Sequence, residues 1–294
     1  MVTFSPLGGL NLSLVAWQGR KMMRFTAYSS LVLLSASSVG YATTPVPYGG
    51  LPTDYSYVEL ADMAFAAPQT IGATISEAVP LKGKLAGDLP VGTTRYYIQA
   101  DVTALISGTG VPSHLTYLVD LPNPPKGKLK LKGVPVLLLA ATTANPGELR
   151  LVGPRAQVPR TPENESRLRA ILTAAVSPDA PPAITGITRA FHVAGTLPGE
   201  SETQIFLRTA DKRPISLSVL RRPHEDPRWA VALSELVDDS AAPPKPNSLL
   251  WYRLACGLPK ALPDEAVAGL ADPDAKAARD DYQVVLTGLG PCRG

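Results

Sequence analysis

Apolar and polar residues alternate over several short stretches between residues 54 and 159. In residues 94–106, for example, Ile98 and Ala100 alternate with Gln99 and Asp101, which is typical of a strand with one buried face. A short helix is predicted ahead of these stretches, at residues 57–67, because its apolar positions recur at helical spacing and a proline follows it. Strands are predicted at residues 70–79, 94–106, 115–121, 134–141 and 148–152.

Five strands within about 100 residues favour a small closed or partly open β-barrel, and a barrel of the oligonucleotide/oligosaccharide-binding (OB) type is one such solution. We therefore expect residues 54–159 to form an N-terminal β-barrel-like domain. The prolines between the apolar runs fit rigid turns that separate short elements.

The hydrophobic pattern changes at residue 160. Thr161 and Pro162 form a typical helix start, and Leu168, Ile171, Leu172 and Ala175 then fall on one helical face. Four strands with short turn-like connections follow, which favours an antiparallel sheet. We therefore expect residues 160–294 to form an α+β domain, with strands at 184–193, 203–208, 215–221 and 229–237, a helix from about 248 to 258 and a last helix at 274–286.

Residues 22–42 have the three parts of a secretory signal peptide. A positive stretch ends at Arg24, an uncharged apolar run follows over residues 25–39, and small residues stand at the cleavage positions up to Ala42. A membrane anchor is the alternative, but the run is shorter than the roughly 20 residues that a spanning helix needs. We expect residues 1–21 to be an extension from a misassigned gene start, and residues 43–53 to be a flexible lead-in.

Export changes the charge of the chain. The whole sequence has 28 basic and 25 acidic residues, and residues 1–42 hold three of the basic ones and none of the acidic ones. The chain after Ala42 therefore has a formal net charge of zero. Because nucleic-acid-binding proteins usually carry a basic face, nucleic acid is excluded as an expected partner.

Cys256 and Cys292 are the only cysteines, and both lie near the C-terminus. In an oxidising compartment an even pair is more often a disulfide than a metal site, and two thiols without nearby histidines fall short of four zinc ligands. We predict a disulfide between them, and no metal.

His192, Glu200 and Glu202 flank a turn at residues 195–199 and are candidate catalytic residues. A hairpin there could hold an imidazole near two carboxylates, an arrangement able to perform acid–base chemistry or to bind a metal. The more common meaning of this pattern is a strand histidine beside a solvated turn. Either face of the hairpin could be buried, so alternation does not decide between the two.

Four lysines alternate with small or apolar residues in a second candidate site, at Lys126, Lys128, Lys130 and Lys132. On a strand their ammonium groups would point one way and form a surface for an anionic ligand. Lysines of this kind also protect exposed sheet edges from pairing with other chains, and that is their commoner role.

Motifs of the well-known enzyme and cofactor classes are absent from the sequence. It contains no Gly-x-Ser-x-Gly, no Gly-x-x-x-x-Gly-Lys, no His-Glu-x-x-His, no Cys-x-x-Cys and no dinucleotide fingerprint. We therefore expect no cofactor, and a catalytic role is not favoured.

Four segments carry a resemblance: residues 181–186 (PPAITG), 190–193 (AFHV), 199–207 (GESETQIFL) and 249–256 (LLWYRLAC). They resemble an uncharacterised family of exported bacterial proteins of the alphaproteobacterial type. No activity is assigned to that family, so the resemblance implies a bacterial envelope setting and no catalytic residue.

Together these patterns predict a periplasmic or secreted protein without a transmembrane span after cleavage. The expected role is non-enzymatic binding of an envelope protein or a glycan. Two alternatives are an envelope hydrolase that uses Glu200, Glu202 or His192, and an exported enzyme inhibitor.

Overall fold

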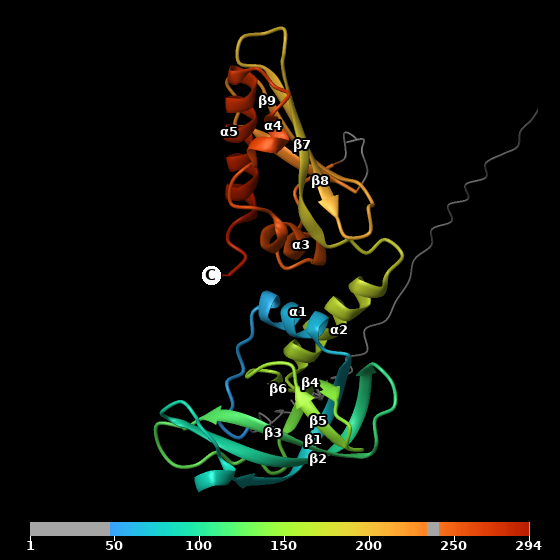
Figure 1. Cartoon of the computed structure of the whole chain (residues 1–294), viewed down its shortest axis with the longest axis vertical. Helices are drawn as coiled ribbons and strands as arrows, with labels where there is room; N and C mark the ends of the chain where they lie inside the picture. Colours follow the sequence, from blue (N-terminus) through green and yellow to red (C-terminus); the bar gives the residue numbers. More distant parts are fainter. Residues whose placement is uncertain (1–47, 234–240, 294) are drawn as a thin grey trace, which may run out of the picture. The chain divides into compact units, whose positions relative to one another are not determined.

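The computed structural model describes residues 48–233 and 241–293. Within these ranges the chain is an α+β protein: a closed five-stranded barrel with two helices comes first, and a four-stranded antiparallel sheet with C-terminal helices follows (Figure 1). This confirms the predicted α+β fold class with a small closed barrel, a four-stranded antiparallel sheet and C-terminal helices. The predicted signal peptide and the extension before it lie outside the described residues.

The barrel closes because its fourth strand pairs back to its first. Its strands are β1 (Gln69–Pro80), β2 (Thr93–Ser107), β3 (His114–Pro122), β4 (Pro135–Thr142) and β5 (Glu148–Leu151). Their order is β1-β2-β3-β5-β4, with a further β1–β4 pairing, and all neighbours are antiparallel except β3 and β5. A single 3₁₀ turn, η1 (Gly83–Leu85), lies between β1 and β2, and a short strand, β6 (Gln157–Pro159), pairs with β4.

Strand alternation fills the barrel interior. The side chains that point inward are almost completely buried, and they include Ile98 and Ala100 of β2 and Leu115 and Tyr117 of β3. Gln99, which stands between Ile98 and Ala100 on β2, is exposed. Tyr117 donates a hydrogen bond of 2.7 Å to Oε1 of the buried Gln157, and burial raises the pKa of its hydroxyl. The interior thus follows the period of two that the sequence predicts.

A second apolar core lies outside the barrel wall, where two helices cover β4. They are α1 (Tyr57–Ala66), which begins with a capping box between Ser56 and Glu59, and α2 (Pro162–Val176), which is capped by Thr161. Leu168 and Ile171 of α2 pack with Leu60 of α1 and with Leu137 and Leu139 of β4. The sequence placed this helix at the start of the second domain, but its apolar face completes a core of the barrel region.

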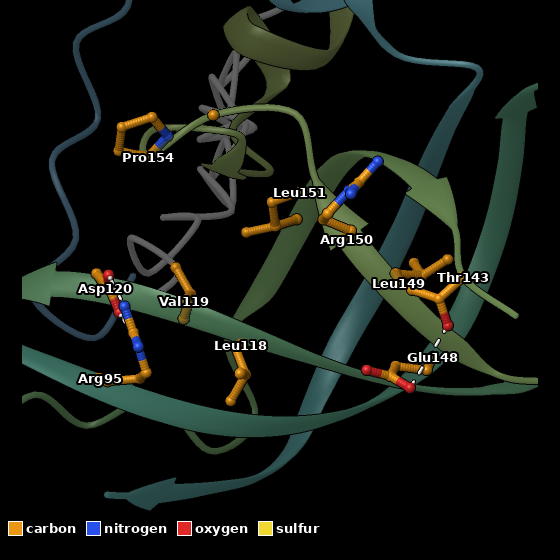
Figure 2. A pocket seen from close by; sticks show the side chains of 11 residues that line it. Arg95, Leu118, Val119, Asp120, Thr143, Glu148, Leu149, Arg150, Leu151 and Pro154 are labelled. Carbon is orange, nitrogen blue, oxygen red and sulfur yellow. Dashed lines mark hydrogen bonds and ion pairs between the residues drawn. The ribbon is translucent and has the colours of Figure 1, made fainter. Parts of the chain in front are cut away.

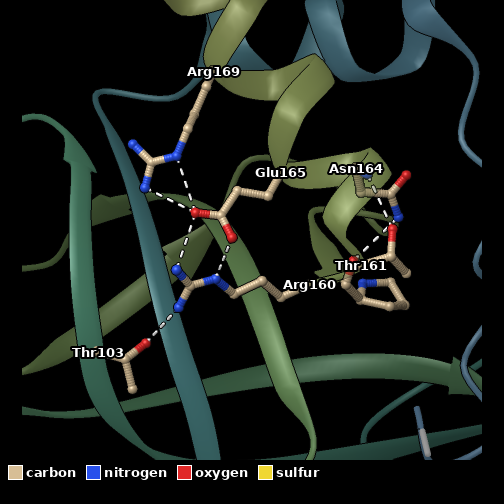
Figure 3. A network of polar contacts seen from close by, with 7 residues as sticks. Thr103, Arg160, Thr161, Asn164, Glu165 and Arg169 are labelled. Carbon is tan, nitrogen blue, oxygen red and sulfur yellow. Dashed lines mark hydrogen bonds and ion pairs between the residues drawn. The ribbon is translucent and has the colours of Figure 1, made fainter. Parts of the chain in front are cut away.

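Ion pairs attach α2 to the barrel (Figure 3). The guanidinium of Arg160 donates to both carboxylate oxygens of Glu165, at 2.6 and 3.0 Å, and also to the hydroxyl of Thr103 on β2 at 2.8 Å. Arg169 donates to the same carboxylate. These contacts, chiefly the hydrogen bond from Arg160, lower the pKa of Glu165 from 4.5 to about 2.

Replacing Glu165 by glutamine tests this attachment. A carboxyl whose pKa is lower in the folded protein stabilises it above the unfolded pKa of 4.5 and loses this contribution as the pH falls to about 2. We expect E165Q to lower the free energy of unfolding at pH 7 by about 2 kcal/mol, after allowance for solvent screening. Urea denaturation from pH 7 to pH 2 should show the gap between the two proteins closing.

Glu163→Gln is the matched control, since Glu163 lies on the same helix in an exposed i,i+4 pair with Arg167. Such a pair contributes about 0.5 kcal/mol or less. Equal effects of E163Q and E165Q at pH 7 would contradict the stabilising role of the Arg160–Glu165 contact.

The second region is an antiparallel sheet with helices on one face. The strands run in the order β10-β9-β8-β7. They are β7 (Ile184–Ala194), β8 (Ser201–Thr209), β9 (Ile215–Arg221) and β10 (Arg228–Ala232). The helices are α3 (Leu249–Gly257), α4 (Asp264–Val267) and α5 (Asp272–Leu289). The strand predicted at 229–237 ends at Ala232, and residues 234–237 of that prediction lie outside the described residues.

One core joins this sheet to its helices. Ile205 and Leu217 from the sheet pack with Leu254 of α3 and with Tyr282 and Val285 of α5, which runs along the sheet (Figure 1). The side chain of Cys256 on α3 is joined by a disulfide to Cys292, just after α5, as the sequence predicts. In the part of the chain described by the structure, no helix is long and apolar enough to span a membrane.

Candidate functional site

The outer surface of β2 and β3 carries three rows of paired side chains. Because alternate residues of a strand point to opposite faces, the odd-numbered residues of β2 point away from the interior filled by Ile98 and Ala100. Directly opposite residues of an antiparallel pair have their Cβ atoms about 5 Å apart. The rows are Arg95 with Asp120, Tyr97 with Leu118, and Gln99 with Thr116.

The first row is a bidentate ion pair. Nε and Nη2 of Arg95 donate to the two carboxylate oxygens of Asp120 at 2.6 and 2.7 Å. The hydrogen bond from Arg95 holds the pKa of Asp120 below its ordinary value, so the carboxylate is ionised at neutral pH. Each carboxylate oxygen keeps a free lone pair and the guanidinium keeps further N–H donors. The pair therefore offers both donors and acceptors while adding no net charge.

The second row is apolar and exposed. Tyr97 is 36% exposed and its partner Leu118 is 49% exposed, and Val79 of β1 pairs with Tyr97 on the other side. Three apolar side chains thus lie side by side across three strands on the outer surface. Large exposed side chains in one place more often mark a binding surface than scattered single ones do.

A groove begins where β3 and β5 separate. The two strands form only two register pairs, Thr116 with Glu148 and Tyr117 with Leu149, so the segments after them are free to diverge. The groove between them has a volume of about 550 Å³. Its lining comprises Arg95, Leu118, Val119, Asp120, Thr143, Glu148, Leu149, Arg150, Leu151, Gly153 and Pro154.

Polar groups lie at the two ends of this groove and apolar ones between them. Figure 2 shows the Arg95–Asp120 pair at one end, Glu148 beside Thr143 at the other, and Leu118 between the two ends. Ligand sites typically combine an apolar wall with a few fixed polar groups, in volumes of about 300–1,000 Å³. The groove has that composition and that size.

A second hollow of about 420 Å³ lies across the β4–β5 turn and shares Thr143, Glu148 and Leu149 with the first. Gln69 lines it with a side chain whose Nε2 donates to the carbonyl of Thr109 at 2.8 Å. Its Oε1 has no hydrogen-bond partner among the described residues. Gly108 has a φ of +100°, and a Cβ there would lie 2.8 Å from the Gln69 side chain. The glycine therefore lets the β2–β3 turn approach Gln69 closely.

The structure does not bring His192, Glu200 and Glu202 together. His192 pairs with Thr203 in the sheet, whereas Glu202 pairs with Val193, one position on, and so points to the opposite face. Glu200 lies in the turn, where its carboxylate accepts a hydrogen bond of 3.4 Å from the backbone N–H of Leu197. The carboxylate of Glu200 thus contacts the turn, and Glu202 lies on the exposed face of the sheet.

His192 instead contacts a buried carboxylate from α5. The hydroxyl of Thr203 donates to Oδ2 of Asp281, so it accepts from Nδ1 of His192, 2.8 Å away. Arg221 donates from Nε to the other oxygen of Asp281 at 2.6 Å. Asp281 is completely buried and the His192 side chain is only 7% exposed. This cluster joins the sheet to α5, with Thr203 and Asp281 buried and the Arg221 side chain 36% exposed.

The four lysines do not lie on a strand. Residues 126–132 follow β3 as an irregular segment, and Lys128, Lys130 and Lys132 line a separate groove. Among residues 48–233 and 241–293, no group of three or more His, Cys, Asp or Glu side chains is placed to hold a metal ion.

Sequence reasoning missed Arg95, Asp120 and Asp281. Arg95 lies two residues from Tyr97 on β2, so its side chain points to the same outer face. Its pairing with Asp120 depends on the register between β2 and β3, which no local sequence pattern gives. Asp281 lies on a helix 78 residues from its hydroxyl partner Thr203, and no local pattern marks that contact.

Comparisons with protein-family models, with curated proteins and with solved structures find no match to this chain. The resemblance to an uncharacterised family of exported proteins therefore stays a prediction. Function has to be inferred from the groove on the barrel and from the surface beside it.

Proposed function

We propose that this protein is an exported, non-enzymatic binding protein that holds an oligosaccharide on the outer face of β2 and β3. The observation that carries the proposal is the juxtaposition of the exposed Tyr97–Leu118 row with the Arg95–Asp120 ion pair at the mouth of the groove. A sugar has an apolar C–H face and a rim of hydroxyl groups, and these two surfaces match the two rows.

The strand order supports a barrel of the OB type. Closure in the order β1-β2-β3-β5-β4-β1, with a parallel β3–β5 contact, is the connectivity of a five-stranded Greek-key barrel. OB-type barrels bind oligonucleotides and oligosaccharides on the face of their second and third strands, bordered by the β1–β2 and β4–β5 loops. The groove lies beside that face and takes Thr143 from the β4–β5 loop.

Charge favours a sugar over a nucleic acid at this surface. Arg95 is neutralised by Asp120, and Glu148 adds a carboxylate against the single further guanidinium of Arg150. A phosphate backbone would need a surplus of cations along the groove. Hydroxyl groups can instead accept from the guanidinium groups and donate to the carboxylates.

The disulfide supports an exported protein. Disulfides persist in oxidising compartments and are rare in the cytosol, and the Cys256–Cys292 bond fits the periplasmic or secreted setting that residues 22–42 predict. An envelope location would bring the groove into contact with the glycans of the cell surface.

Replacing Asp120 by asparagine tests the proposal. The protein without residues 1–42 is screened against an array of bacterial envelope oligosaccharides, and the best neutral ligand is titrated by calorimetry. Because hydrogen bonds to an ionised group contribute about 1.5–3 kcal/mol, we expect D120N to weaken binding by roughly tenfold or more. Tyr97→Ala should weaken it as well, through loss of the apolar platform.

Asp101→Asn is the matched control, since Asp101 lies on the outer face of the neighbouring strand β2 in an exposed pair with His114 and does not line the groove. D101N should bind as tightly as the unmodified protein. Binding that D101N and D120N affect equally, or a protein that binds no oligosaccharide of the array, would overturn the proposal.

A further inference from the structure

The lysine-rich segment is fixed against the barrel at alternate positions. Leu131 is buried in the barrel core and Leu129 packs against it, while Lys128, Lys130 and Lys132 between and beside them are exposed. The backbone N–H of Lys130 donates to the carbonyl of Gly49 at 3.1 Å, which holds the middle of the segment. The three ammonium groups are thus presented on one side of an ordered stretch of chain.

This segment forms one wall of a groove whose other wall is the end of β1. Backbone hydrogen bonds join Ile75 of β1 to Val134 and Gly133. In the described part of the chain, no backbone hydrogen bond joins residues 76–80 of β1 to the lysine-rich segment 126–132. The space between the walls has a volume of about 840 Å³. Its lining is Ser76, Glu77, Ala78, Pro80, Tyr96 and residues 128–132.

The lysines of the barrel region gather at or beside this groove. All six lysines between residues 48 and 176 lie either in the segment 126–132 or at positions 82 and 84, which follow the groove residue Pro80. The three lining lysines form no ion pair within residues 48–233 and 241–293, whereas Arg95, Arg155 and Arg160 of the same region are all paired. Glu77 is the one acidic side chain in the lining, so the lining carries a net positive charge.

We propose that this lysine groove binds a linear anionic polysaccharide. Three unpaired ammonium groups in a row match a polymer with a carboxylate or phosphate group on successive units. The groove is concave, so a chain can lie in it, whereas a flat bilayer surface would reach only its rims. Tyr96 in the lining offers a ring against a sugar face.

The site is independent of the oligosaccharide groove on the outer face. The two grooves share no lining residue. Either site can therefore be tested, and can fail, without the other.

The probe is polygalacturonate, which carries a carboxylate on every unit, with neutral dextran of similar length as the control polymer. We expect polygalacturonate to bind and dextran not to bind, with an affinity that falls steeply as salt rises because counterions are released on binding. Replacing Lys128, Lys130 and Lys132 by glutamine should weaken binding by at least about tenfold.

A second triple variant controls for net charge. Lys212, Lys245 and Lys260 are exposed and lie in the other region of the chain, so their replacement by glutamine removes the same charge away from the groove. This variant should bind within about twofold of the unmodified protein. D120N should also bind polygalacturonate normally, which separates failure of this site from failure of the oligosaccharide site.

Three results would overturn the proposal. The first is equal weakening by the two triple variants, which would indicate a diffuse charge effect. The second is binding to vesicles of anionic phospholipid with no binding to polygalacturonate. The third is aggregation of the variant of the groove lysines when neither this variant nor the unmodified protein binds polygalacturonate, which would assign these lysines to protection of the β1 edge.

Discussion

Replacing Asp281 by alanine is expected to lower the free energy of unfolding by about 3–5 kcal/mol. Its carboxylate is completely buried and accepts hydrogen bonds from Arg221 and from Thr203, which in turn accepts from His192. Removal of the carboxylate would leave a partly buried guanidinium and a buried hydroxyl without their acceptor. The loss of buried charged partners is one of the few single changes with an effect of this size.

Asp280→Ala provides the control for this experiment. Asp280 is the preceding residue of α5, exposed, and pairs with Lys276 one helical turn away. That pair contributes about 0.5 kcal/mol or less. Urea denaturation of the two variants and of Asp281→Asn, which keeps the shape and loses the charge, should give a large loss for D281A, an intermediate loss for D281N and almost none for D280A. If D281A and D280A behave alike, the cluster does not stabilise the junction of sheet and helix.

Removal of the disulfide is expected to cost a similar amount. The bond closes a loop with a sequence separation of 36 residues, for which restriction of the unfolded chain contributes about 4 kcal/mol. The double variant Cys256→Ser, Cys292→Ser should lose this free energy. In the native protein the bond supplements a hydrogen bond from Trp251 to the carbonyl of Leu289, which also joins α3 to the end of α5.

Reduction separates the disulfide from the serine substitutions themselves. Dithiothreitol should lower the unfolding free energy of the unmodified protein to that of the double variant and should leave the double variant unchanged. Thiol titration confirms that reduction is complete. A fully reduced protein with unchanged stability would show that packing of α3 and α5 alone holds the C-terminus.

Much of the fold follows from local patterns, and the exceptions have physical causes. Strands with clear alternation, such as β2, were predicted within a residue or two of their ends. The strand β6 and the helix α4 span three and four residues, too few to show a period. For α2 the apolar face is evident in the sequence, but such a face shows only that the helix packs, and not which core it joins.

The prediction that His192 lies near Glu200 and Glu202 depended on strand register. The turn at residues 195–199 was predicted, but whether Thr203 or Glu202 lies opposite His192 is decided by one residue of register. A slip by one position moves every side chain of a strand to the other face. The observed register places Thr203 beside His192 and leaves Glu202 exposed. The buried Asp281 then comes from a helix far along the chain.

The two-sided burial of β4 has a consequence for the order of events during folding. Val136 and Leu138 face the barrel interior, while Leu137 and Leu139 face α1 and α2, so this strand has no solvent-facing side. In chain order α1 and β4 both precede α2, the second helix that covers this strand. Until α2 docks, part of the outer apolar row of β4 is open to neighbouring chains. Closure of the barrel alone therefore leaves an aggregation-prone surface, and docking of α2 removes it.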